Sequence, residues 1–495
     1  MGRTKVVVIG AGFSGIAAAT SLADQGYEVT VLEKNAMPGG RARVFKELGF
    51  TFDMGPSWYW MPDVFETYFG QFGQKPSDYY DLVRLDPSYT VIFGENDFID
   101  LPAGVEPIAA LFESIEPGSR IKLKQFLEQA AYKYDVGMHD FVYRPSRSVT
   151  EFLSFKLLVD VIRLDVFQSF HDHIRKFFTH DKILRLMEFP ILFLGALPKN
   201  TPAMYSLMNY AEIQLGTWYP KGGMHTIVQG MVKLAESKGV VFQYNAIVKK
   251  IKIVGQSARS VLTDKGEYEA DVVVAGADYH HVESQLLEPA FRSYDSNYWD
   301  SRILAPSSLL FYVGVNKRLK NLQHHNLFFD EDFMPHAKEI YETPCWPTKP
   351  LFYVSAPSQT DASVAPEGCE NLFILIPVAP DLVDKEDIRE KYYHLVMDRL
   401  EKLTGQSIRD AVVFKRSFAH RDFIADYNAF KGNAYGLANT LMQTALLKPA
   451  LKSKKVNNLF YTGQLTVPGP GVPPSIISGL VVAKEVSKAF ASVTG

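Results

Sequence analysis

The sequence predicts an α/β fold in which a Rossmann-like dinucleotide-binding domain is split along the chain and carries an inserted α+β domain and a helical region. Residues 5–9 (KVVVI) form an unbroken apolar run, which is typical of a strand buried in a parallel sheet. A glycine-rich turn, a helical segment (IAAATSLADQG) and a second strand (EVTVLEK) follow directly. Together these segments predict one complete βαβ unit.

Further parts of the nucleotide-binding domain are expected much later in the chain. Residues 240–253 contain strand-like pieces, and residues 269–278 end another buried strand. A strand, a Gly/Pro loop and a helix follow near the C-terminus. The dinucleotide-binding domain is therefore predicted to comprise residues 1–90, 215–285 and 440–495.

The two inserted regions differ in character. Residues 91–119 and 286–439 include strand-like runs such as SSLLFYVGV and NLFILIPV, which suit a substrate-binding sheet. Residues 120–214 are helix-like. Within residues 152–178, polar side chains recur at helical spacing and leave a wide apolar face, and residues 189–198 form a second apolar run. These apolar surfaces indicate either core packing or a region that faces a membrane.

Composition excludes several classes of function. The 52 basic and 55 acidic residues nearly cancel, so the chain has no electrostatic footprint for nucleic acid. Two cysteines, Cys345 and Cys369, are too few for a disulfide framework and favour a reducing compartment. The start of the chain shows no signal-peptide pattern. No apolar run reaches the ~18–20 residues that a membrane span needs, so we expect a protein that is soluble or bound to a membrane face.

A GxGxxG motif fills residues 10–15 between the first strand and the first helix. Gly10 permits the tight turn, Gly12 lets the backbone approach a pyrophosphate, and Gly15 allows close packing of helix on strand. The helix N-terminus offers free N–H groups to the phosphates. Glu33, at the end of the second strand, is placed to bind a ribose hydroxyl, which favours FAD or NAD over NADP.

A second glycine motif favours FAD over NAD. Residues 37–42 read MPGGRA, and glycines there would let the chain pass close to a pyrophosphate and a flavin. Arg41 is suited to place a cation beside the phosphates. The run GFTFDMGPS, with Asp53 and Gly55, then returns toward the cofactor. A plain turn is the alternative interpretation of Gly39 and Gly40.

The third motif lies near the C-terminus. A strand delivers Gly463, and a Gly/Pro-rich loop leads into a helix that begins near Ser475. The N–H groups of that helix would stabilise the negative charge that a reduced flavin carries near its pyrimidine oxygen.

The segments GAGFSG, LEKNAMPGGRA, GFTFDMGPS, WYPKGGMHTIVQGM and NLFYTGQLTVPGPGVPPSIISG together resemble the bacterial phytoene-desaturase family of carotenoid desaturases. This family is a branch of the FAD-containing amine-oxidase-like superfamily, and the resemblance runs nearly end to end. It implies that FAD is contacted at motif positions Gly10, Gly12, Gly15, Glu33, Gly39, Gly40, Arg41 and Gly55. It also implies a backbone contact of Val248 with the adenine side and places Gly463 and Val472 by the flavin.

The tail departs from the family pattern G-x-x-T-H-P-G-x-G-x-P. Val467 stands where the histidine is usual, so no proton-transfer role is assigned to that position. The resemblance places the YPKGGM run on the wall near the isoalloxazine, with an ordinary turn as the alternative. The pair His171-x-His173 has no matching Cys or acidic pattern, so no metal site is expected.

Function is inferred from the single fingerprint and the resemblance. No second GxGxxG follows a strand with a downstream acid, so electrons are expected to come from the substrate and not from NAD(P)H. The resemblance implies a long acyclic carotenoid substrate, most simply phytoene converted to lycopene by hydride transfer to flavin. Conjugation stabilises an allylic cation, so orientation over the flavin would provide much of the catalysis, and no catalytic base is named.

A forty-carbon hydrocarbon resides in membranes, so the enzyme is expected at the cytoplasmic face of one as a peripheral protein. Oxygen or a quinone is the expected electron acceptor. Three alternatives stay open. The chain could desaturate a hydroxylated carotenoid or isomerise a carotenoid with reduced flavin; it could be an amine oxidase; or it could be a non-catalytic flavin-binding membrane protein.

Overall fold

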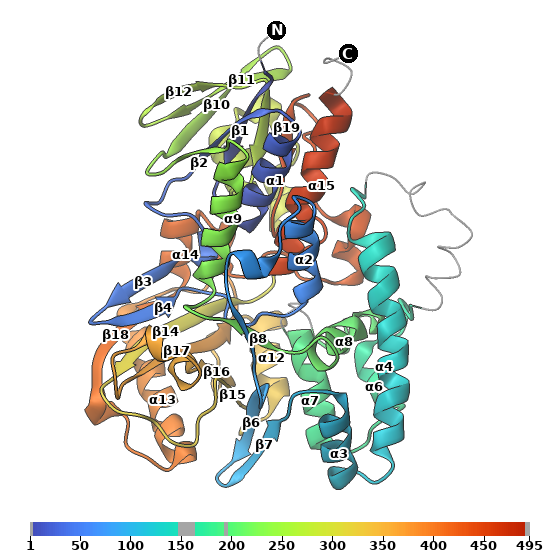
Figure 1. Cartoon of the computed structure of the whole chain (residues 1–495), viewed down its shortest axis with the longest axis vertical. Helices are drawn as coiled ribbons and strands as arrows, with labels where there is room; N and C mark the ends of the chain where they lie inside the picture. Colours follow the sequence, from blue (N-terminus) through green and yellow to red (C-terminus); the bar gives the residue numbers. More distant parts are fainter. Residues whose placement is uncertain (1–2, 147–163, 193–196, 491–495) are drawn as a thin grey trace.

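The computed structural model describes residues 3–146, 164–192 and 197–490. Figure 1 shows a nucleotide-binding sheet at one end of the molecule and a larger sheet at the other, with a group of helices packed beside them. Of the apolar face predicted for residues 152–178, the part at 152–163 lies outside the described residues.

The nucleotide-binding sheet is parallel and has the strand order β19-β13-β1-β2-β9. Its strands are β1 (Lys5–Ile9), β2 (Glu28–Leu32), β9 (Val241–Gln243), β13 (Val272–Ala275) and β19 (Leu459–Tyr461). The predicted βαβ unit is confirmed, with α1 (Phe13–Asp24) as its helix. Strands from distant parts of the chain therefore complete one sheet, while the exact domain boundaries stay a prediction.

Alternation along β1 divides the core between the two faces of this sheet. Val6 and Val8 pack on α1, α9 (His225–Ser237) and α15 (Val472–Phe490). Val7 and Ile9 pack toward a small antiparallel sheet on the other face. Its strands are β10 (Val248–Val254), β11 (Ser257–Thr263) and β12 (Gly266–Glu269).

Small residues bring α15 unusually close to α1. A Cβ atom placed on Gly479 would lie 2.3 Å from the carbonyl oxygen of Ser14 and 2.9 Å from Cβ of Ala17. Only glycine fits such an approach, because real Cβ atoms do not reach these distances. The close packing holds the beginning of α15 at the same end of the sheet as the beginning of α1.

The second sheet is mixed and has the strand order β18-β14-β17-β16-β15-β6-β7. Its strands are β6 (Tyr89–Gly94), β7 (Asp97–Leu101), β14 (Ser307–Val315), β15 (His325–Phe328), β16 (Phe352–Ser355), β17 (Glu370–Val378) and β18 (Val412–Phe418). The runs SSLLFYVGV and NLFILIPV are confirmed as strands, and the structure pairs them side by side in antiparallel order. Helix α13 (Glu386–Thr404) covers one face, and the other face joins the main core.

The helical region contains α3 (Val105–Ile115), α4 (Ser119–Val136), α6 (Phe170–Ile174), α7 (Asp181–Leu192) and α8 (Leu207–Ile213). Of the apolar residues described there, Phe170, Ile174 and Phe189 are buried in the main core, whereas Phe167 is 84% exposed. Core packing thus accounts for most of this apolar surface. Among the described helices, none combines the length and apolarity needed to cross a bilayer.

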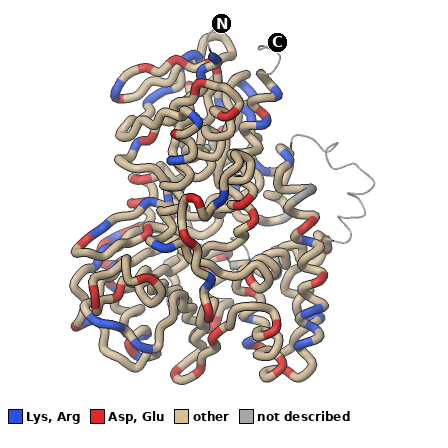
Figure 2. Tube along the Cα trace, in the orientation of Figure 1, with Lys and Arg blue, Asp and Glu red and all other residues tan. Residues whose placement is uncertain are grey.

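The remaining elements are connections and short hairpins. They are α2 (Pro62–Gly70), α10 (Tyr279–His281), α11 (Ser296–Asp300), α12 (Phe333–Tyr341), α14 (His420–Tyr427), β3 (Val44–Glu47), β4 (Phe50–Asp53), β5 (Leu82–Arg84) and β8 (Trp218–Pro220). Charged residues of both signs are interleaved along most of the described trace (Figure 2).

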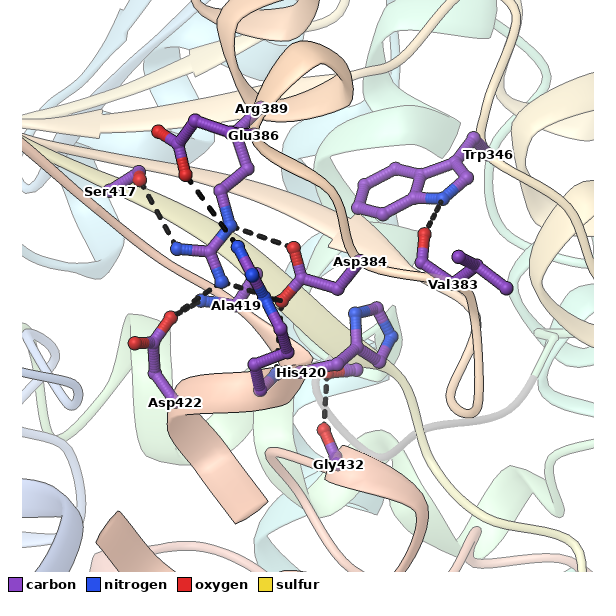
Figure 3. A network of polar contacts seen from close by, with 12 residues as sticks. Trp346, Val383, Asp384, Glu386, Arg389, Ser417, Ala419, His420, Asp422 and Gly432 are labelled. Carbon is purple, nitrogen blue, oxygen red and sulfur yellow. Dashed lines mark hydrogen bonds and ion pairs between the residues drawn. The ribbon is translucent and has the colours of Figure 1, made fainter. Parts of the chain in front are cut away.

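A buried ion network fixes α14 against the second sheet. Arg389 of α13 donates to both oxygens of Asp384, at 2.7 and 2.5 Å, and to Asp422 at 2.7 Å (Figure 3). Asp422 in turn accepts the backbone N–H of Ala419 at the start of α14. This network matters for the site because the C-terminal residues of α14 reach the large cavity described next.

Candidate active site

A cavity of about 620 Å³ lies between the two sheets. At one end it is lined by the carboxyl ends of β1, β2 and β13, where open α/β folds bind ligands. At the other end it is lined by residues of β14 and β17 from the second sheet. The cavity therefore joins a nucleotide-binding edge to the proposed substrate domain.

Nearly all of the sequence-predicted cofactor residues line this cavity. They are Gly10, Gly12, Glu33, Gly39, Gly40, Arg41, Gly55, Val248, Gly463 and Val472. Gly15 does not line it. A Cβ atom at Gly15 would lie 2.1 Å from the carbonyl oxygen of Gly10, so this glycine serves the packing of α1 on β1, as the motif predicts.

Gly12 differs from Gly15 in a way that points to a ligand. It adopts φ −79°, which any residue tolerates, and a Cβ atom there would meet no protein atom within 4 Å. Nothing in the chain's own packing requires glycine at this position. The space over Gly12 belongs to the cavity, directly before the first N–H groups of α1, where phosphates bind.

Glu33 is buried at the end of β2 and organises the turn. Its Oε2 accepts the N–H of Ala11 at 2.9 Å, and its Oε1 accepts the N–H of Asn35 at 2.9 Å. The carboxylate thereby ties the glycine turn to the end of β2. Each oxygen keeps a further acceptor position, and the residue lines the cavity, so Glu33 is placed to accept a ribose hydroxyl as well.

Arg41 is a buried cation on the cavity wall. Its Nη2 donates to the carbonyl oxygen of Asn433 at 3.1 Å, and its guanidinium lies 5.2 Å from the ring centre of Tyr427. Burial lowers the pKa of Arg41, and the nearby Asp278 carboxylate partly offsets that effect. Within the described parts of the chain, the buried Nε of Arg41 has no hydrogen-bond partner. A buried guanidinium with one unpaired N–H group beside a glycine-lined space fits the anionic pyrophosphate of FAD.

Asp278 is a cavity residue that has no assigned role in the sequence motifs. It follows β13, caps α10 through the N–H of His281 at 3.0 Å, and lines the cavity. Burial raises its pKa to about 6, against the N–H donors of His281 and Phe430 and the charge of Arg41. Its position just after a buried parallel strand is the sequence feature that could have identified Asp278 as a site residue.

The far wall of the cavity is largely apolar. It comprises Ser308, Leu310, Phe373, Leu375, Ala434 and Tyr435. Among these lining residues only Tyr435 titrates, and burial raises its pKa to about 12, with the nearby Ser308 hydroxyl lowering it in part. This wall therefore offers no group that is a general base near neutral pH.

The YPKGGM run forms a turn beside the cavity and does not line it. Asp53 accepts the N–H groups of Met224 at 2.7 Å and His225 at 3.1 Å, which caps the start of α9. A Cβ atom on Gly223 would lie 2.5 Å from this carboxylate. The YPKGGM run therefore adopts the ordinary turn that the sequence analysis gave as the alternative interpretation. Val467 is buried and likewise does not line the cavity.

His171 and His173 have separate partners. Nδ1 of His171 lies 3.1 Å from Oε1 of Glu188. His173 packs against Lys133, and burial lowers its pKa to about 4. No group of three metal-binding side chains occurs within the described parts of the chain.

The fold and the cavity define a flavin-binding oxidoreductase. The family of flavin-containing amine oxidoreductases matches residues 13–487, and the chain belongs to it. Within it the chain is a carotenoid desaturase family member: an FAD-dependent enzyme that oxidises CH–CH groups.

Three relatives carry this assignment. The chain is 41% identical to a carotenoid 3,4-desaturase of Haloarcula japonica, over 96% of each chain. It is 34% identical to a zeta-carotene-forming phytoene desaturase of Myxococcus xanthus, over 97% of this chain and 93% of the relative. It is 32% identical to a 4,4'-diapophytoene desaturase of Staphylococcus haemolyticus, over 97% and 98%.

Solved structures share the fold at low identity. An oxidoreductase from Methanosarcina mazei superposes with a TM-score of 0.63 at 16% identity, over 97% of this chain and all of the other. A putrescine oxidase variant gives 0.62 at 13% identity, over 99% of this chain and all of the other.

Proposed function

We propose that this protein desaturates a long acyclic carotenoid and that its favoured reaction is 3,4-desaturation. The observation that carries the proposal is the apolar wall of Leu310, Phe373 and Leu375, which closes the same cavity that the glycine motifs open. A polyene offers hydrocarbon and no charge, and each buried CH₂ contributes about 0.8 kcal/mol. The 41% identity to a carotenoid 3,4-desaturase favours the position.

Conversion of phytoene to lycopene is the second candidate. The Myxococcus relative, a zeta-carotene-forming phytoene desaturase 34% identical to this chain, favours phytoene as the substrate, and lycopene would require further desaturation of that product. Both reactions remove a hydride from one carbon and a proton from its neighbour, and they differ in how much of the chain is already conjugated. The same apolar wall can bind the substrate of either reaction, so identifying the reaction products distinguishes the two candidates.

The cofactor contacts are part of the proposal. The amides around Gly12 and the guanidinium of Arg41 hold the pyrophosphate, and Glu33 holds the ribose. Val248 lies on the adenine side, and Gly463 and Val472 lie beside the flavin. The other contacts are Gly10, Gly39, Gly40 and Gly55, with Gly15 acting through packing.

The chain's own contribution to chemistry is orientation. Bound FAD supplies the hydride acceptor. The wall excludes water and fixes the hydrocarbon, which lowers the entropic barrier to transfer. Tyr435 stays protonated near neutral pH because burial raises its pKa to about 12, so it does not act as a base. Loss of the hydride leaves an allylic cation, which acidifies the neighbouring C–H bond enough for water to take its proton, and oxygen or a quinone would reoxidise the cofactor.

Peripheral binding to the cytoplasmic face of a membrane completes the proposal. The substrate is held in bilayers by tens of kcal/mol, on the order of 0.8 kcal/mol for each CH₂, so the enzyme must meet it there. Phe167 is 84% exposed on the helical region, which supports the helical region as the part of the molecule that contacts the membrane.

The test uses purified, FAD-loaded protein with liposomes that contain phytoene, lycopene or a hydroxylated acyclic carotenoid. Under anaerobic conditions a substrate should bleach the flavin, and its product should gain a double bond in its absorption spectrum. A Leu375→Glu variant should lose flavin bleaching, whereas Val413→Glu, at a position 45% exposed on β18, should keep it.

Each other outcome has a defined meaning. Bound FAD that no carotenoid reduces would exclude desaturation. Peroxide formed from amines would make the protein an amine oxidase. A cis–trans change without net oxidation would make it an isomerase.

A further inference from the structure

A buried lysine without a carboxylate partner lies behind the C-terminal motif. Lys448 is 5% exposed, and its Nζ donates to Oδ1 of Asn439 at 2.9 Å and to the carbonyl oxygen of Pro468 at 3.2 Å. Burial lowers the pKa of this ammonium to about 7, and no carboxylate of the described chain offsets that burial. Both of its partners are neutral.

The ammonium is packed directly on the loop that leads into α15. A Cβ atom on Gly469 would lie 2.6 Å from Nζ of Lys448 and 3.1 Å from Oδ1 of Asn439. Gly469 adopts φ +142°, a conformation that favours glycine. Two and three residues further on, Gly471 and Val472 line the large cavity, and Val472 begins α15. The lysine therefore packs on the loop that leads directly into the cavity wall.

Holding the loop in place does not by itself explain why position 448 carries a positively charged ammonium. A neutral amide or hydroxyl would satisfy Asn439 and Pro468, whereas an ammonium with only neutral acceptors loses its hydration without a compensating ion. The first N–H groups of α15 form the positive end of a 19-residue helix on the same side of the cavity. The Lys448 ammonium and the N-terminus of α15 would together stabilise a negative charge that develops at this end of the cavity during the reaction.

We propose that Lys448 is a positioning residue for the flavin: it holds the loop of residues 468–471 and the start of α15 against the cavity, and its charge favours reduction of the flavin. The inference rests on the proposed placement of the flavin beside Gly463 and Val472. A reduced flavin carries negative charge on its pyrimidine ring, so a cation behind that loop lowers the free energy of the reduced form.

The test measures the midpoint potential of the FAD-loaded protein and its affinity for sulfite, which adds reversibly to oxidised flavin and leaves a negative charge on the ring. Lys448→Gln keeps a hydrogen-bond donor and removes the charge, Lys448→Met removes both, and Lys448→Arg keeps the charge. Lys455→Met removes an exposed charge seven residues away and is the matched control.

We expect Lys448→Gln to keep FAD, to weaken sulfite binding about tenfold and to shift the reduction equilibrium by a similar factor. A tenfold change corresponds to about 30 mV for a two-electron couple. Lys448→Met should show at least the same shifts, and the arginine and control variants should stay within threefold of the unchanged protein.

An unchanged potential and sulfite affinity in Lys448→Gln would overturn the charge role. If the Gln and Met variants lose FAD but the Arg variant keeps it, the requirement for a cation is supported. If all three lose FAD, the side chain acts only as a spacer and the proposal is wrong. Neither measurement uses a carotenoid, so a failure here is distinct from a failure of the proposed function.

Discussion

Substituting alanine at Gly12 and at Gly15 separates binding of the cofactor from folding. The two glycines are three residues apart in one motif, but their surroundings differ. At Gly12 the added methyl group meets no protein atom within 4 Å and the backbone φ is −79°, so folding should be almost unaffected. At Gly15 the methyl group would lie 2.1 Å from a backbone oxygen, so β1 and α1 would have to separate.

The magnitude for Gly12→Ala follows from the bonds at risk. A methyl group in that space would displace a pyrophosphate from the first amides of α1, and each charge-assisted hydrogen bond contributes about 1.5–3 kcal/mol. Loss of two such bonds raises the Kd for FAD by at least about a hundredfold. The unfolding temperature of the FAD-free protein should change by no more than a few degrees, about what a change of 0.5–1 kcal/mol at a helix N-cap produces.

The assay combines FAD titration by fluorescence quenching with thermal unfolding of the FAD-free protein. Gly15→Ala is the matched comparison, and it should unfold at a much lower temperature or fail to accumulate. If Gly12→Ala binds FAD with unchanged affinity, the pyrophosphate does not lie over this residue and the assignment of the glycine motif is wrong.

Three further predictions concern single side chains. Glu33→Ala leaves the buried N–H of Ala11 without its acceptor and should reduce FAD retained after dialysis, by about 1.5–3 kcal/mol of binding, with undiminished flavin content as the contrary result. Burial raises the pKa of Asp53 to about 7, so the folded protein holds a proton that the unfolded chain releases above about pH 4, and stability from this group is lost as pH rises toward 7. Asp53→Asn should therefore reduce the difference between urea midpoints at pH 5 and pH 8, and an equal difference in both proteins would contradict this. Tyr435→Phe should slow flavin reduction by much less than the roughly 10²–10⁴-fold that a general base supplies, with an unmoved pH profile, whereas a larger loss would identify Tyr435 as the proton acceptor.

The parts of the site that were predictable are those that local sequence determines. The turn of residues 10–15 and the acid at Glu33 are close in sequence and in space, because a βαβ unit brings the end of β2 beside the end of β1. The runs that became β14 and β17 were identifiable because a strand buried on both faces is continuously apolar. Residues 91–119 were grouped with this sheet, but the strand order, in which β15 joins β6 and β7 to the rest, was not identifiable because register and neighbours depend on packing.

Contacts between distant segments were beyond local reasoning. Asp53 caps α9 from 171 residues away, and no spacing rule connects the two. Asp278 faces Arg41 only because β13 is inserted beside β1. Lys448 stands in the run LLKP, and nothing in that run distinguishes a buried ammonium from an exposed one. Such side chains become visible only when the packing of the whole chain is known.

The distribution of polarity along the cavity constrains how selectivity can arise. Charged and hydrogen-bonding groups lie at the end of the nucleotide-binding sheet, so under the proposed contacts the binding energy for the cofactor would come from its phosphates and ribose. The wall of Leu310, Phe373 and Leu375 is then free to pack on hydrocarbon. Hydrophobic pockets discriminate weakly, by about 1–3 kcal/mol for each methylene. Under the proposed function, the position of the new double bond must therefore depend on how far a stiff conjugated chain reaches along this wall, and not on recognition of one group.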